Sequence, residues 1–200
     1  MLKELFFRFI DLLDAVLFEP FRAENVISSW GTNPLRSVWT FILFLSSLSA
    51  GAGYVFISPP FTNRSVGQLI TAAIAHLIFF LLLPYAVAFI TDGYAQSRGR
   101  KGNAAIFLHF VRFSLSLFLT AGAWGILLSQ FGLKGSFGIV TLYTIHYGFF
   151  ITVMVRGTSY IYDLKFRDSL VINLTTFLIT FFLPLSMYFA IISSFTPAFQ

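Results

Sequence analysis

Three histidines and one arginine stand inside long apolar segments of the chain, where ionisable side chains are uncommon. They are His76, His109, Arg112 and His146. An ionisable residue within a membrane-spanning segment is a functional-site hypothesis by default. At a rise of about 1.5 Å per residue, His76 and His146 lie about 14–15 Å from one end of their segments. Arg112 lies about 12 Å from the opposite end of its own segment, so the polar side chains could share one level near the membrane centre.

Two kinds of role are open for these residues. The histidines could form hydrogen bonds between helices, and Arg112 could extend its guanidinium to the headgroups or bond carbonyls and a histidine. Alternatively, Arg112 could help to bind an anionic lipid or substrate. His76 and His146 could also ligate one haem, because neutral imidazole is an axial ligand. No further haem motif accompanies them, and we expect no cofactor.

The remaining sequence carries no recognisable catalytic pattern. The chain has no cysteine, which excludes disulfides, thiolate zinc sites and iron–sulfur clusters. It has no His-Glu-x-x-His metal motif and no nucleotide-binding fingerprint. Asp92, Asp163 and Asp168 are expected to form a solvated, charge-balanced rim with nearby basic residues; a cation site is the alternative. We therefore expect a protein that is not an enzyme.

Five long apolar runs position these residues. The chain has 200 residues, of which 57% are hydrophobic and 10% charged, against about 45–50% and about 25% in soluble domains. The sequence predicts an all-α, polytopic membrane bundle of five transmembrane helices. Their expected ranges are 37–57, 67–90, 104–131, 136–155 and 169–194, which together form one membrane domain over 37–200.

The positive charges predict the orientation of this bundle. Most of the 13 Lys and Arg residues lie before the first run or in the second and fourth gaps. The first gap holds only Arg64 and the third only Lys134. Since cytoplasmic loops retain Lys and Arg, we expect the N-terminus inside and the C-terminus outside. The basic residues are too scattered for a nucleic-acid surface, so the expected partner is the lipid bilayer.

Residues 1–36 are expected to lie on the cytoplasmic face. Within residues 2–19, charged residues recur at spacings of three and four opposite a face rich in Leu and Phe, which is typical of an amphipathic helix. This helix could lie in the membrane interface or pack across the ends of the spans. Asn33 and Pro34 mark a turn before the first span.

Small residues predict close helix packing in two spans. Ser47 and Gly51, like Ser49 and Gly53, are four residues apart in the first span, and Gly122 stands in a small patch of the third. Such spacing permits close approach of helices. The approach could be within the chain, or to a second copy or another membrane subunit.

The layout resembles the Yip1 family of membrane proteins, which have a cytosolic N-terminal segment, five spans and an outer or lumenal C-terminus. The resemblance rests on the segment from Leu17 to Arg22 and on the short polar stretch from Arg156 to Ser169. The Asp-Leu-Tyr-Gly-Pro motif of the eukaryotic branch is missing, as is its Gly-Tyr-Ser motif, where this chain reads His109 to Ser114. The resemblance therefore implies a bacterial inner-membrane member, with an ER or Golgi membrane as the alternative. It implies no catalytic residue.

These observations favour a non-enzymatic integral membrane protein that acts as a scaffold or accessory subunit of a membrane complex, with other subunits or further copies of itself as partners. The alternative is a transporter component for a lipid or small anionic molecule, with Arg112 and the histidines lining its path.

Overall fold

The computed structural model describes residues 2–57 and 66–182, with side-chain contacts from Phe6 onward. These residues are arranged as helices, and no strand occurs among them. In chain order they are α1 (Leu2–Leu17), α2 (Pro20–Ser28), α3 (Thr32–Ile57), α4 (Val66–Ser97), α5 (Ala104–Ser114), the 3₁₀ segment η1 (Leu115–Thr120), α6 (Ala121–Gln130), α7 (Gly135–Ile161), α8 (Phe166–Phe177) and the π-helical segment η2 (Leu178–Phe182). The all-α prediction is confirmed.

Among the described residues, four helical segments are long and apolar enough to cross a membrane: Thr32–Ile57, Val66–Ser97, Ala104–Gln130 and Gly135–Ile161. They contain the first, second and fourth predicted spans and all of the third except residue 131, and they indicate a multi-pass membrane protein. The predicted span 169–194 begins in α8 and η2. Its second half lies outside the described residues, so a fifth span stays a prediction.

The observed helices extend beyond the apolar runs that predicted them. α3 begins at Thr32, and Pro34, which we expected at a turn, lies instead in its first helical turn. A first-turn position suits proline because no intrahelical N–H bond is needed there. α4 continues to Ser97 and α7 to Ile161, since polar residues outside the hydrocarbon core can still complete helical hydrogen bonds.

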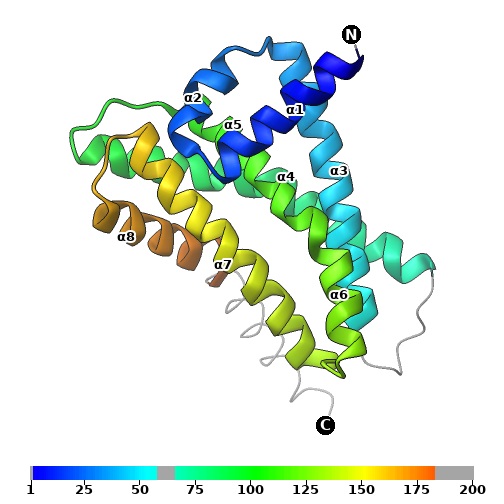
Figure 1. The fold of residues 1–200 in the computed structure, drawn as a ribbon. Helices are drawn as coiled ribbons and strands as arrows, with labels where there is room; N and C mark the ends of the chain where they lie inside the picture. Colours follow the sequence, from blue (N-terminus) through cyan, green and yellow to red (C-terminus); the bar gives the residue numbers. More distant parts are fainter. Residues whose placement is uncertain (1, 58–65, 183–200) are drawn as a thin grey trace.

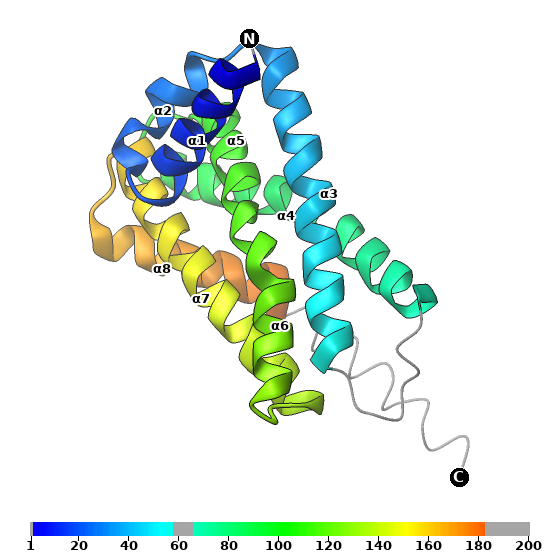
Figure 2. The same ribbon diagram turned by 45° about the vertical axis from the view of Figure 1, so that its right-hand side comes forward.

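The long helices do not all run in parallel. α3 and α6 lie side by side, whereas α4 crosses α3 obliquely in both views (Figures 1 and 2). Gly51 stands at this crossing, because a Cβ on it would lie 2.7 Å from the backbone nitrogen of Ala73. α7 packs against α5 and α6, and α8 packs against α7.

The N-terminal helices α1 and α2 form a hairpin over the end of the bundle where α3 and α5 begin (Figure 1). Arg22 closes the hairpin through hydrogen bonds to Glu19 and Asp11, which raise the pKa of its guanidinium. Leu12 and Val16 are fully buried in the main core, whereas Phe6 and Ile10 on the adjacent stripe are 59% and 46% exposed. The helix therefore packs across the bundle end, and it leaves an apolar stripe that can contact lipid.

Candidate functional site

His76 is bound to a neighbouring helix through its ring. Its Nδ1 lies 2.7 Å from the carbonyl oxygen of Ala72 in the same helix, and its Nε2 lies 2.6 Å from the hydroxyl of Tyr143 on α7. Because a carbonyl can only accept, Nδ1 donates, and Nε2 of the neutral ring accepts from Tyr143. The pair joins α4 to α7.

His146 of α7 makes a similar pair of contacts, one within its own helix and one to a neighbouring segment. Its Nδ1 lies 2.9 Å from the carbonyl oxygen of Leu142, and its Nε2 lies 3.2 Å from the hydroxyl of Thr120 in η1. His146 is 3% exposed, and its ring stacks on Phe118 with 5.5 Å between centroids. His146 thus fixes α7 to the 3₁₀ segment.

An aromatic cluster separates the two histidines. Phe80 packs between His76 and Phe118, with centroid distances of 5.9 and 4.8 Å, and Tyr147 stacks on Tyr143 at 6.0 Å. No hydrogen bond links His76, His109, Arg112 and His146 to one another within the described ranges. Both ring nitrogens of His76 and of His146 are engaged by oxygen atoms. The described residues also contain no group of three or more His, Asp or Glu that could hold a metal ion.

Arg112 lies at the junction of α3, α4 and α5. One guanidinium nitrogen donates to the hydroxyl of Tyr85 at 2.6 Å. The guanidinium carbon lies 5.0 Å from the Tyr85 ring centroid and 5.6 Å from that of Trp39. His109, one turn earlier, stacks on Phe113 instead, and its Nδ1 is buried with no hydrogen-bond partner. The structure therefore divides the expected polar cluster into three separate places.

The small residues of the first and third spans meet within the chain. A Cβ on Gly53 would lie 2.5 Å from the carbonyl oxygen of Ala121, and one on Gly125 would lie 2.5 Å from the Cα of Gly53. Gly122 donates its N–H to the hydroxyl of Ser49 at 2.9 Å. Ser47, by contrast, bonds the carbonyl oxygen of Leu43 in its own helix at 2.7 Å.

Serine hydroxyls also hold the 3₁₀ segment in the middle of the third span. Ser46 donates to the carbonyl oxygen of Leu115 at 2.9 Å, and Ser49 donates to that of Leu119 at 2.8 Å. A change from α-helix to 3₁₀-helix shifts the backbone hydrogen-bond pattern, so carbonyl oxygens in η1 need other donors. The serines on α3 supply two of them.

Asp92 is the polar residue whose role the sequence did not indicate. Our prediction of a solvated rim is wrong for this residue, which is only 8% exposed. Its Oδ1 accepts from the hydroxyl of Tyr162 at 2.8 Å and from the backbone N–H of Asn103 at 2.9 Å, and its Oδ2 accepts from Gln96 at 2.6 Å. Burial, followed by the bond to Asp92, raises the pKa of Tyr162 above its ordinary value. Asp92 thus joins the ends of α4 and α7 to the start of α5.

Asp163 fits the expected rim better, since its side chain is 95% exposed and bonds Arg100 at 3.0 Å. This ion pair connects the loop after α4 with the loop after α7. Asp168 lies in the first turn of α8, where a carboxylate interacts favourably with the helix dipole.

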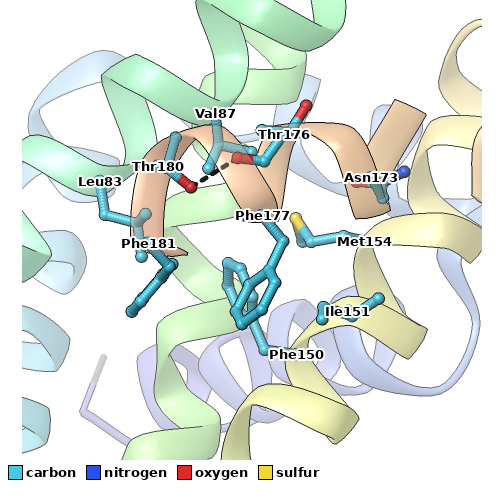
Figure 3. Close-up of a pocket in the computed structure, with 10 residues that line it drawn as sticks. All are labelled: Leu83, Val87, Phe150, Ile151, Met154, Asn173, Thr176, Phe177, Thr180 and Phe181. Atoms are coloured by element: carbon cyan, nitrogen blue, oxygen red, sulfur yellow. Dashed lines mark hydrogen bonds between the residues drawn. The ribbon is translucent and has the colours of Figure 1, made fainter. Parts of the chain in front are cut away.

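A narrow cavity lies between α4, α7 and α8 (Figure 3). Its volume of about 10 Å³ is close to the minimum for one water molecule. Asn173 and Thr176 of α8 line it, and both are buried. Asn173 donates to the hydroxyl of Thr158 at 3.0 Å, whereas the hydroxyl of Thr176 has no partner. The cavity suits a single bound water molecule.

One small-residue stripe on α7 faces outward. Thr144, Gly148 and Thr152 recur at spacing four and are all exposed. A Cβ on Gly148 would have no atom within 4 Å, unlike the crowded glycines of the third span. Among the described residues, no other helix packs on this stripe.

Comparison with protein-family models found no match, and neither did comparison with curated proteins or with solved structures.

Proposed function

We propose that this membrane protein is not an enzyme but a scaffold or accessory subunit of a membrane complex. The observation that carries the proposal is that interior polar side chains in the described part of the bundle bond within the chain. The polar side chains of Ser46, Ser49, His76 and His146 bond partners in the same chain. The cavity between α4, α7 and α8 has room for about one water molecule. We therefore expect the function to depend on the exposed surface of the bundle, where another protein can bind.

The stripe of Thr144, Gly148 and Thr152 is where a partner helix would pack most closely. Helix association in membranes depends on van der Waals packing of small residues, because lipid offers no hydrophobic driving force. The filled glycine contacts between α3 and α6 illustrate this packing within the chain. We propose that the stripe on α7 makes the same type of contact with a second copy or another membrane subunit.

Photocrosslinking in native membranes tests this proposal. A photoreactive phenylalanine analogue in place of Thr152 should yield a protein–protein adduct. The same analogue in place of Ile78, an exposed residue of α4, is the matched control and should yield little. The proposal is contradicted when neither position gives an adduct, or when both give equal amounts.

Gly148→Leu provides a second, independent variant. Because nothing lies within 4 Å of a Cβ at this position, the substitution should leave the fold intact while it pushes a partner helix away. We expect the complex to dissociate on native gels at an unchanged Tm. An unchanged complex would contradict the proposed contact between this stripe and a partner helix.

The proposed transporter alternative has less support. It needs Arg112 and the histidines along one path, but Arg112 packs against Trp39 and Tyr85 while His76 and His146 belong to the aromatic cluster. Membership of the Yip1 family, the bacterial inner membrane and the inside location of the N-terminus stay predictions.

A further inference from the structure

Arg112 carries a charge that the described part of the chain does not neutralise. No Asp or Glu carboxylate in that part lies within 4.0 Å of its guanidinium. Among the described residues, its guanidinium donates a hydrogen bond to the hydroxyl of Tyr85, and its Nε is buried without a partner. A cation at this depth gains stability from a nearby anion, because partial burial weakens its hydration.

The aromatic neighbours fix the position of the guanidinium. Trp39 is 6% exposed and forms the inner wall, while Tyr85 is 50% exposed and forms the outer one. Tyr85 accepts from Arg112 and so keeps its own hydroxyl proton for another acceptor. Arg112 and Tyr85 together therefore offer N–H and O–H donors beside a surface that also presents Phe89, which is 82% exposed.

The depth of this position matches one headgroup layer. The helix from Ala104 to Gln130 is about 40 Å long, whereas the hydrocarbon core is about 30 Å thick. If the excess is shared between its ends, the Cα of Arg112 lies about 7 Å below the headgroups, which an extended arginine can span. Trp39, about 10 Å along α3, lies at a similar level, as expected of an interfacial aromatic residue.

We propose that Arg112 and Tyr85 bind the phosphate of an anionic lipid headgroup, in the leaflet on the side of the α1–α2 hairpin. The guanidinium pairs with the phosphate, and the Tyr85 hydroxyl donates a second hydrogen bond. Trp39 holds the guanidinium in place from behind. This lipid site is independent of the stripe on α7 and of the proposed scaffold role.

Lipid titration of the purified protein tests the site. Phosphatidylglycerol is added to delipidated protein, and bound lipids are counted by native mass spectrometry. Arg112→Gln should lower the affinity for the most tightly bound phosphatidylglycerol about tenfold, since hydrogen bonds from a charged group are lost. Tyr85→Phe should lower the same affinity several-fold. Lys134→Gln, which removes an exposed charge at the opposite end, is the matched control and should change nothing.

Two further arms separate the lipid from other anions and from simple charge attraction. Phosphatidylcholine should bind at least several-fold more weakly than phosphatidylglycerol, and millimolar inorganic phosphate should not displace the lipid. Displacement by free phosphate would replace the lipid site with a soluble-anion site and overturn the proposal. An Arg112→Gln affinity within twofold of the wild type would overturn it too. If that variant does not fold, an unchanged affinity in Tyr85→Phe has the same consequence.

Discussion

Removal of the Asp92 carboxylate should be among the most destabilising single changes on the hairpin side of the bundle. Asp92→Ala leaves three donors without their acceptor. Gln96 is exposed and can turn to water, but Tyr162 is only 3% exposed as a whole residue and Asn103 is half-buried. Each of these two donors loses a bond to a charged acceptor, worth about 2 kcal/mol, so the expected loss is about 4 kcal/mol.

Thermal unfolding in detergent measures this loss. For a chain of this size, about 1 kcal/mol corresponds to a Tm shift of about 2–4 °C, so Asp92→Ala should lower the Tm by about 10 °C. Asp92→Asn should cost only about 1 kcal/mol, because its amide oxygen can still accept from both Tyr162 and Asn103 if Gln96 flips. Asp163→Ala is the matched control, since its exposed ion pair is worth well under about 1 kcal/mol.

The reasoning fails if Asp92→Ala unfolds within about 2 °C of the wild type, or if Asp163→Ala lowers the Tm equally. In either case, the three hydrogen bonds would not connect α4, α5 and α7 energetically.

Three smaller predictions concern packing, helix contacts and pH. Gly51→Ala should destabilise the folded protein by about 1–3 kcal/mol in thermal unfolding, because the new Cβ would lie 2.7 Å from the backbone nitrogen of Ala73. Gly93→Ala is the control and should be neutral or stabilising, because nothing lies within 4 Å of a Cβ at that position. Ser49→Ala should cost about 1–2 kcal/mol by the same assay, since it removes two hydrogen bonds to the third span. The raised pKa of Tyr162 means that the folded state keeps a proton that the unfolded state loses above about pH 10. The stabilisation from Tyr162 should therefore be complete below that pH and decrease above it. In thermal unfolding at increasing pH, Tyr162→Phe should show a smaller fall in Tm than the wild type.

The sequence predicted four spans well because long apolar runs leave few alternatives to a membrane helix. It also identified Gly51, Gly53 and Gly122 as positions of close packing, although spacing alone could not say which helix each one meets. The 3₁₀ segment was not predictable, since it depends on Ser46 and Ser49 bonding carbonyls that lie 69 and 70 residues away.

The candidate sites were less predictable than the helices. Depth along each span placed His76 and His146 at one level, but rotation about the helix axes determines their partners, and Tyr143 and Thr120 gave no local indication. Asp92 was missed for a related reason. Its donors come from the start of α5 and the end of α7, and the charge of a loop-side aspartate predicts solvent exposure unless those partners are known.

The proposed role as a scaffold or accessory subunit is tested most directly by the mass of the particle extracted from native membranes. The tagged protein is solubilised gently, and the intact species is weighed by native mass spectrometry after lipid is removed. We predict a mass well above the 22.5 kDa of one chain, with a second copy or another membrane protein accounting for the difference. A lone chain of 22.5 kDa under these conditions would contradict the proposal.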